Sequence, residues 1–186
     1  MTPFALSLAE LAAYQSPHYE YAGVVFIQGT LIDQSRNELV RQFLATDATH
    51  LLMLDTDLEF RFDLLDKLVA MNEKAGCGWF NIRIGRESRP ALMRFEDEFH
   101  STLIDVTTET PEYFSADMGP SGAMFMHREV FERMREGGEP YWFKFTHANG
   151  LTMTEDVHFC QLLRQYGYRL MVCRDAQMRH WKVQAL

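Results

Sequence analysis

The segment Leu51–Asp57 constrains the fold of this chain more than any other, because four apolar residues run directly into two carboxylates spaced one apart. An apolar run of this length between polar residues is typical of a strand buried on both faces of a sheet. In open α/β sheets, ligands bind beyond the carboxyl ends of such strands. Asp55 and Asp57 at that end are poorly explained by stability, since desolvated carboxylates are costly unless they are paired or bind a cation. Although a lone Asp-x-Asp also occurs by chance, this position favours a site for Mg²⁺ or Mn²⁺.

The length of 186 residues predicts one domain, spanning 1–186, with a sizeable core. A hydrophobic content of 47% excludes a disordered chain, and the net charge of −8 argues against a protein that coats nucleic acid by charge alone. Cys77, Cys160 and Cys173 are odd in number and show no close pairing, which indicates buried thiols in a reducing compartment. No signal peptide is evident, and no apolar run approaches the roughly 20 residues that span a bilayer. We therefore expect a soluble, cytoplasmic protein.

Strand and helix signals alternate along the chain, which predicts an α/β fold with a mostly parallel central sheet flanked by helices. In the first half the expected elements are a short helix within Met1–Tyr14, strand Gly23–Ile27, helix Ile32–Thr46, strand His50–Leu54, helix Phe62–Lys74 and strand Gly76–Ile84. In the second half they are strand Ala123–Met126, helix Arg128–Arg135, strand Trp142–Phe145, loop His147–Thr152, helix Glu155–Tyr166 and strand Arg169–Cys173. The weakly alternating residues 96–112 predict a hairpin or flap.

Arginines form two features of the pattern. Arg36 falls within the apolar stripe of its predicted helix, so its side chain either extends past the core to solvent or points at an anion. A second group clusters around Gly85 and Pro90, and consists of Arg83, Arg86, Arg89 and Arg94. This group predicts either a solvated charged loop or a loop that binds phosphate or an acceptor.

Two further features could carry chemistry. The sequence Thr152–Glu155 matches a capping box, in which Glu155 reaches back to the helix start. Asp156 shares a helical stripe with Cys160, which predicts that it points inward and makes it the better candidate for a general base. His180 follows the last predicted core strand. Taken alone it reads as a core-edge histidine, and together with the two acidic clusters it becomes a candidate third metal ligand.

Taken together, these motifs resemble the GT-A glycosyltransferases, especially small bacterial and phage enzymes, over roughly Leu31 to Lys182. The residues that carry the resemblance are Ile32–Asn37, Leu54–Asp57, Gly119–Phe125, Thr154–Cys160, Gly167–Tyr168 and His180. The combination is specific, although no single motif is.

The resemblance implies a nucleotide-diphosphate sugar as donor, with Mn²⁺ or Mg²⁺ bridging its diphosphate to the Asp-x-Asp turn. It implies that Asp57 ligates the metal directly, that Asp55 faces the nucleotide ribose or the metal shell, and that His180 completes the coordination. Arg36 would then lie near the nucleotide.

By the same resemblance, Glu155 and Asp156 match the acidic pair near the acceptor, where one acid deprotonates the attacking hydroxyl in inverting enzymes. The turn at Gly122 would shape the pocket for the donor sugar and the acceptor. GT-A domains usually open with a strand that contacts the nucleotide base, whereas Met1–Leu11 leads directly into a predicted helix. Either the chain starts downstream of that strand, or the fold has a changed base pocket.

The function expected from the sequence is therefore metal-dependent transfer of a hexosyl or pentosyl group to a hydroxyl acceptor. The acceptor is a glycan or, given the arginine cluster, a hydroxylated base in DNA. Two alternatives stay open: an inactive GT-A-like module that only binds sugars or a partner, and a metal-dependent nucleotidyltransferase or phosphohydrolase that shares the acids.

Overall fold

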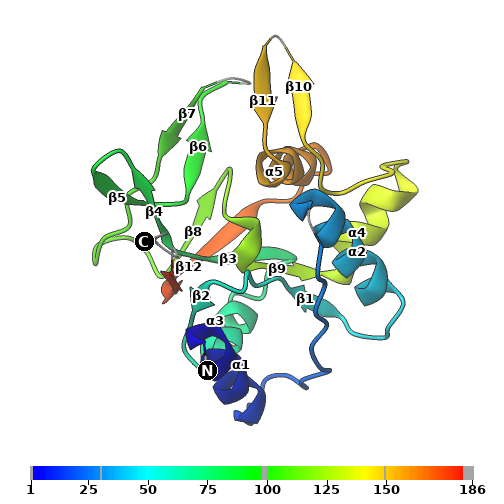
Figure 1. The fold of residues 1–186 in the computed structure, drawn as a ribbon, viewed down its shortest axis with the longest axis vertical. Helices are drawn as coiled ribbons and strands as arrows, with labels where there is room; N and C mark the ends of the chain where they lie inside the picture. Colours follow the sequence, from blue (N-terminus) through cyan, green and yellow to red (C-terminus); the bar gives the residue numbers. More distant parts are fainter. Residues whose placement is uncertain (1, 30, 98–99, 149, 182–186) are drawn as a thin grey trace.

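A five-stranded sheet in the order β1-β9-β3-β12-β8 lies between two layers of helices (Figure 1). The computed structural model describes residues 2–29, 31–97, 100–148 and 150–181; Met1 and Lys182, which bound predicted segments, lie outside them. The strands of this sheet are β1 (His50–Leu52), β9 (Met124–His127), β3 (Ala75–Trp79), β12 (Leu170–Gln177) and β8 (Tyr113–Ala116). The helices are α1 (Pro3–Ala13), α2 (Ile32–Leu44), α3 (Leu64–Ala70), α4 (Arg128–Glu136), α5 (Glu155–Gln165) and the short 3₁₀ turn η1 (Ser121–Ala123).

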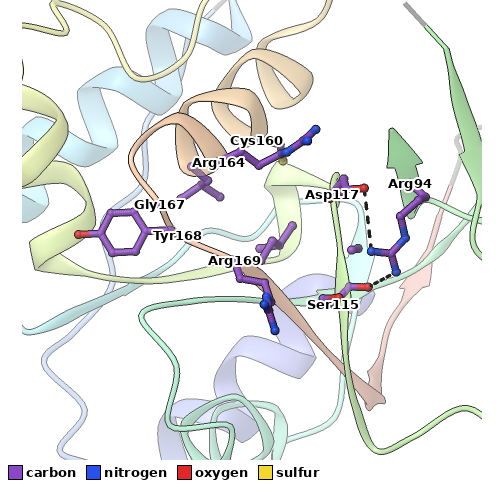
Figure 2. A pocket seen from close by; sticks show the side chains of 11 residues that line it. Arg94, Ser115, Asp117, Cys160, Arg164, Gly167, Tyr168 and Arg169 are labelled. Carbon is purple, nitrogen blue, oxygen red and sulfur yellow. Dashed lines mark hydrogen bonds and ion pairs between the residues drawn. The ribbon is translucent and has the colours of Figure 1, made fainter. Parts of the chain in front are cut away.

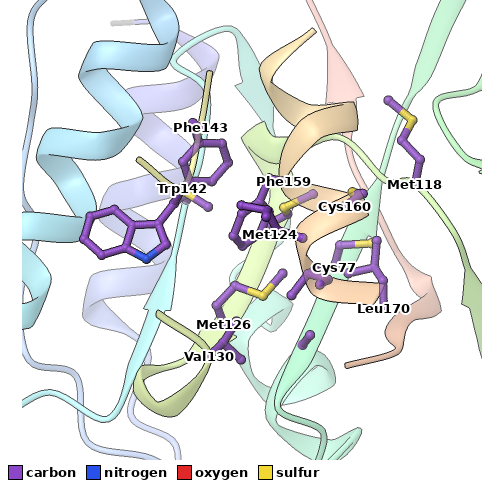
Figure 3. Close-up of a cluster of buried hydrophobic side chains, with 14 of the residues drawn as sticks. Cys77, Met118, Met124, Met126, Val130, Trp142, Phe143, Phe159, Cys160 and Leu170 are labelled. Atoms are coloured by element: carbon purple, nitrogen blue, oxygen red, sulfur yellow. The ribbon is translucent and has the colours of Figure 1, made fainter. Parts of the chain in front are cut away.

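The two faces of the sheet carry separate apolar cores. Helices α2, α4 and α5 cover one face, and α1 and α3 cover the other (Figure 1). Strand β9 shows the alternation that this requires, because Met124 and Met126 enter the first core while Phe125 enters the second. Figure 3 shows the first core, in which Phe159 of α5 packs beside the methionines of β9. The sheet is thus buried on both sides, as the apolar strand patterns predicted.

Local sequence explains where helix α1 begins and where helix α5 ends. Thr2 caps α1 by accepting a hydrogen bond from the Ala5 amide at 3.3 Å, and Pro3 occupies the first helical position. Helix α5 ends at Gln165 and is followed by Gly167, whose φ of +80° is readily adopted only by glycine. The Gly167 amide donates to the Arg164 carbonyl, and the Tyr168 amide donates to the Leu163 carbonyl at 2.8 Å. This is a Schellman motif, which turns the chain sharply into β12.

Four two-stranded ladders surround the central sheet. They pair β2 (Leu58–Glu59) with β13 (Arg179–His180), β4 (Asn81–Ile84) with β5 (Glu87–Pro90), β6 (Met93–Phe95) with β7 (Ser101–Leu103), and β10 (Thr146–Ala148) with β11 (Leu151–Met153). Figure 1 shows β4–β5 and β6–β7 beside β8, and β10–β11 projecting beyond α5. The hairpin predicted within residues 96–112 is realised in part, because β7 pairs with the preceding β6.

The α/β class with flanking helices is confirmed, but the expectation of a mostly parallel sheet is wrong. Within the described sheet only β3 and β12 pair in parallel, while β1–β9, β3–β9 and β8–β12 pair antiparallel. The crossover through α3 does return β3 in the direction of β1, as the strand–helix–strand order predicted. Strand β9 then inserts between β1 and β3, and this long-range insertion leaves no mark in the local pattern.

Two predicted strands differ in the structure. Residues 23–27 form no strand, and Val24, Val25 and Phe26 are 45%, 48% and 66% exposed. Their β-propensity produces no ladder, because these residues pair with none of the described strands. The segment predicted as one strand over Gly76–Ile84 is two strands, broken at the buried Phe80, whose carbonyl accepts from the Ala91 amide at 2.9 Å.

The region before α5 also differs from expectation. Trp142–Phe145 is an irregular segment instead of a strand, although Trp142 and Phe143 are buried. The Asn37 side-chain oxygen accepts from the amides of both aromatic residues, at 2.9 and 3.1 Å, so a side chain replaces the missing ladder. His147–Thr152, predicted as a loop, forms most of the β10–β11 hairpin.

The three cysteines are free and buried, in agreement with the predicted buried thiols. Burial raises the pKa of the Cys160 thiol to about 12, so this thiol is protonated at neutral pH. Within the described residues, no helix combines the length and apolar character needed to cross a bilayer.

The packing of α4 predicts a large stability effect at Phe131. Its ring is fully buried and lies 5.8–6.1 Å from the rings of Phe43, Trp142 and Phe159. We expect Phe131→Ala to lower the free energy of unfolding by about 3–5 kcal/mol, through lost burial and the cavity it leaves. Chemical denaturation measures this. The same substitution at the exposed Phe26 serves as control and should change the value by less than ~0.5 kcal/mol; equal effects would contradict the described core.

Candidate functional site

A buried arginine lies at the centre of the candidate site. Arg36 of α2 is 6% exposed, and its guanidinium donates to both carboxylate oxygens of Asp55, at 3.2 and 3.3 Å. The same guanidinium forms a close ion pair with Glu155, the first residue of α5. Of the two interpretations open at the sequence level, the structure therefore selects an arginine that points at anionic groups. It joins the segments that carry the two predicted acidic clusters.

The two acids at the start of α5 take the reverse of their predicted orientations. Glu155 is 5% exposed and bonded to Arg36, whereas Asp156 is half-buried. The Oδ1 atom of Asp156 accepts from the Thr154 hydroxyl and, at 2.9 Å, from the Val157 amide, so Asp156 supplies the local hydrogen bonds of the helix start. The expectation that Glu155 caps the helix and that Asp156 points inward is wrong. A buried ion pair with Arg36 outweighs the local capping box.

Electrostatics at Glu155 have two opposing contributions. Burial raises the pKa of Glu155, and the Arg36 guanidinium lowers it. Burial is the larger effect, and Asp156 next in sequence adds to the rise. The single positive charge of Arg36 is thus paired with two carboxylates, those of Asp55 and Glu155, and Asp156 adds a third at the margin of the site. The excess of negative charge is the environment in which a cation is stabilised.

The turn at Gly122 approaches Asp55 closely. The Gly122 carbonyl accepts a hydrogen bond from the Asp55 amide at 3.2 Å. A Cβ atom at position 122 would lie 2.1 Å from the Oδ2 atom of Asp55. Only glycine therefore fits beside this carboxylate, as the sequence predicted for a turn that lets the backbone approach a site.

A small ladder brings His180 to the Asp-x-Asp turn. Strand β13 pairs with β2, which follows Asp57, and His180 aligns with Leu58. The Nε2 atom of His180 lies 2.9 Å from the Oδ2 atom of Asp57, although the two residues are separated by 123 positions in sequence. The Trp181 amide donates to the Asp57 carbonyl at 2.8 Å, and the Phe80 ring packs 4.8 Å from the His180 ring.

The residues that could hold a metal fit a site with few protein ligands. Asp57 and His180 contribute a carboxylate and an imidazole side by side, a donor pair suited to Mn²⁺. Asp55, the third predicted ligand, is instead held by Arg36. Among the described residues, no three His, Cys, Asp or Glu side chains come together as a metal-binding group. A metal would therefore take two ligands from the protein and the remainder from water or substrate phosphates, which is common for Mg²⁺ and related ions.

Two polar residues of the site were given no role from the sequence. Asn37 follows Arg36, and its side chain bonds to the backbone of Trp142 and Phe143, so it fixes that segment against helix α2. Ser121 precedes Gly122; it is 1% exposed, and its hydroxyl has no hydrogen-bond partner among the described residues. Such a buried unpaired hydroxyl calls for a ligand or water. Both lie in motifs that the sequence marked, but their side-chain geometry depends on distant segments.

The arginine cluster divides between two hairpins. Arg83, Arg86 and Arg89 belong to the β4–β5 hairpin, and Arg94 lies in β6. Arg89 is paired with Glu87 and Asp105. A cavity of about 510 Å³ lies between this hairpin and His180, with Arg61, Asn81, Ser88 and Gln177 in its lining. His180, one of the two metal-ligand candidates, thus borders a polar cavity.

The fold formed by this sheet and its flanking helices is GT-A-like. Two solved structures resemble it. A197 from STIV is 15% identical and superposes with a TM-score of 0.53 over 88% of this chain and 82% of its own. GalNAc-T7, solved with UDP, GalNAc and Mn²⁺, is 14% identical, with a TM-score of 0.57 over 82% of this chain and 31% of its own length. No family model matches the sequence, and no curated protein matches it. The likeness is one of fold.

The ion pairs of Arg36 predict a large stability effect. Arg36→Met leaves Glu155 buried without its partner, and we expect a loss of about 3–5 kcal/mol in the free energy of unfolding. Arg41→Met, an exposed position of the same helix, should cost less than ~0.5 kcal/mol. Denaturant titration of both variants makes the comparison. The double variant Arg36→Met/Glu155→Gln should recover part of the loss, because no uncompensated buried charge remains; equal values for the single and double variants would contradict the assignment.

A second prediction concerns His158 on the buried face of α5. Burial, followed by the charge of Lys144, lowers its pKa from 6.5 to about 4. Between these two values the unfolded chain binds the proton and the folded chain does not, so stability is lost as pH falls from 6.5 towards 4. From pH 7.5 to 5 this residue should cost about 2 kcal/mol.

The measurement is the pH dependence of unfolding free energy in the natural chain and in His158→Gln. The variant should lack this part of the slope, while its Glu155 contribution is unchanged. His147→Gln, the same substitution at an exposed histidine, is the matched control variant. Parallel pH profiles for the natural chain and His158→Gln would show that His158 does not titrate as described.

Proposed function

We propose that this chain is a metal-dependent glycosyltransferase that moves a sugar from a nucleotide-diphosphate donor to a hydroxyl acceptor. One observation carries the proposal: in a GT-A-like fold, Arg36 brings Asp55 and Glu155 together while the β2–β13 ladder sets His180 against Asp57. The acids that looked isolated in the sequence thus border one region. The UDP, GalNAc and Mn²⁺ in the GalNAc-T7 structure make UDP-sugars and Mn²⁺ the first ligands to test.

The donor side of the site would use the Asp-x-Asp turn and Arg36. Asp57 and His180 would hold Mn²⁺ or Mg²⁺, which as a Lewis acid stabilises the negative charge of a departing nucleoside diphosphate. Asp55, fixed by Arg36, would orient the nucleotide ribose beside that metal. Gly122, whose missing Cβ lets the Asp55 carboxylate lie against the backbone, would help to hold that carboxylate in place. Positioning and electrostatics would therefore supply most of the acceleration.

On the acceptor side, the geometry favours Asp156 as the general base. Glu155 is occupied by its ion pair with Arg36, whereas Asp156 is half-buried and takes both of its hydrogen bonds at Oδ1. Its Oδ2 atom could therefore accept the proton of an acceptor hydroxyl. Glu155 would act through Arg36 by fixing the guanidinium. The cavity beside His180, with Arg61 and Arg179 in its lining, supports a polar or anionic acceptor, either a glycan or a hydroxylated DNA base.

Donor binding and turnover test the proposal. In the presence of Mn²⁺, a UDP-sugar should raise the melting temperature and be slowly hydrolysed to UDP and free sugar. Asp57→Asn and His180→Gln should each reduce hydrolysis by at least about 100-fold, because the diphosphate loses its metal. Asp47→Asn, at an exposed position outside the site, is the matched control and should keep full activity.

The products separate the alternatives. Release of pyrophosphate or inorganic phosphate would identify a nucleotidyltransferase or phosphohydrolase. A thermal shift with no turnover for any donor in a panel of nucleotides and sugars would identify a binding module. Absence of any shift with Mn²⁺ and the whole panel would overturn the proposal.

A further inference from the structure

A second cavity, of about 550 Å³, lies beside the C-terminal half of α5 (Figure 2). It is bordered by β8, β6 and the turn that follows α5, and none of the residues assigned to the transferase site lines it. Arg164 in its wall is nine residues beyond Glu155, which corresponds to roughly 14 Å along the helix. The cavity is therefore separate from the region where Arg36 and the acids meet.

The cavity has a strong positive charge in an acidic protein. Arg94 from β6, Arg164 from α5 and Arg169 from the turn before β12 all line it, against the single carboxylate of Asp117. Three positive charges and one negative charge give a local balance of +2, whereas the whole chain carries −8. A concave surface of one sign concentrates ions of the other.

The arginines of this cavity are only partly neutralised by the protein. Arg94 donates to the Ser115 carbonyl at 2.8 Å and lies 3.9 Å from Asp117, as the dashed lines in Figure 2 show. Arg164 stacks its guanidinium 5.5 Å from the Phe95 ring, a contact that fixes the side chain and leaves its charge uncompensated. Arg169 is exposed and has no ion-pair partner among the described residues. Guanidinium donors thus remain available within the cavity.

We propose that this cavity binds the phosphate monoester group of a small molecule. A phosphate monoester carries about −1.5 to −2 charges at pH 7, which matches the local balance of +2. A carboxylate or a phosphate diester would neutralise only half of it. Guanidinium groups bind phosphate oxygens with paired, charge-assisted hydrogen bonds. The volume lies within the roughly 300–1,000 Å³ typical of small-ligand pockets.

The test is an NMR titration of the full chain with inorganic phosphate, following the amides of Gly167 and Ser115, which border the cavity. Acetate and dimethyl phosphate, added at equal ionic strength, supply the monoanionic comparison. Phosphate should give saturable shifts centred on the cavity, and the monoanions should bind at least about tenfold more weakly. Equal shifts with acetate, or no saturable shift with phosphate, would overturn the proposal.

Substitutions locate the site. Arg164→Gln and Arg169→Gln should each weaken phosphate binding about tenfold, as expected for a lost charge-assisted bond. Arg135→Gln, an exposed arginine in the last turn of α4 as Arg164 is in the last turn of α5, is the matched control and should leave affinity unchanged. Asp117→Asn should tighten binding, because it removes the competing carboxylate; a purely structural role of Asp117 would not produce this gain. Equal loss in Arg135→Gln and Arg164→Gln would show non-specific attraction and overturn the proposal.

Two further ligands identify the source of the phosphate. Glycerol 3-phosphate should bind at least as well as inorganic phosphate, whereas vesicles containing phosphatidic acid should bind no better than neutral vesicles. Binding confined to the vesicles would overturn the assignment to a small molecule. Because none of these variants alters Arg36, Asp57 or His180, UDP-sugar binding should be unchanged, and failure of either proposal can be recognised separately.

Discussion

The guanidinium of Arg36 is the interaction on which the candidate site depends. It holds the carboxylates of Asp55 and Glu155, which lie 19 and 119 residues away in sequence, and so ties the end of β1 and the start of α5 to helix α2. Breaking one partner of a buried pair leaves an uncompensated charge, which costs far more than an exposed pair stabilises. The three segments are thus held in one relative position, and Asn37 on the same helix extends that constraint to the irregular segment at Trp142.

Sequence reasoning located these segments because each leaves a local signal. The apolar run before Asp55, the helical stripe containing Arg36 and the glycine-rich turn at Gly122 all follow from short-range periodicity and backbone sterics. The GT-A-like fold was predicted from the resemblance that these motifs carry together. The strand order was not, because the insertion of β9 between β1 and β3 joins residues more than 40 positions apart in the chain. The strand predicted at residues 23–27 is absent for a different reason: local strand propensity was present, but without a partner strand it produces no ladder.

The orientation of the two neighbouring acids shows the limit of local rules at the site itself. Adjacent residues on a helix point about 100° apart, so only one of two neighbouring acids can lie on the buried face. The capping-box pattern favoured Glu155 as a cap, but a capping hydrogen bond stabilises a helix by only about 1 kcal/mol. A buried arginine with a free donor outweighs them, and its position was fixed by packing of α2. The tertiary contact therefore decided which carboxylate stays accessible for chemistry.

Helix α5 arranges charge in opposite senses at its two ends. Its first turn carries Glu155 and Asp156, and its last turn carries Arg164, with Arg169 just beyond the Schellman turn. Both placements are favourable with respect to the helix macrodipole, which stabilises anions at the N-terminus and cations at the C-terminus. One short helix can therefore border an acidic region suited to a cation and a basic cavity suited to an anion without an electrostatic penalty for either. Since the chain as a whole is acidic, the basic end depends on arginines brought from β6 and from the turn before β12, which only the tertiary fold supplies.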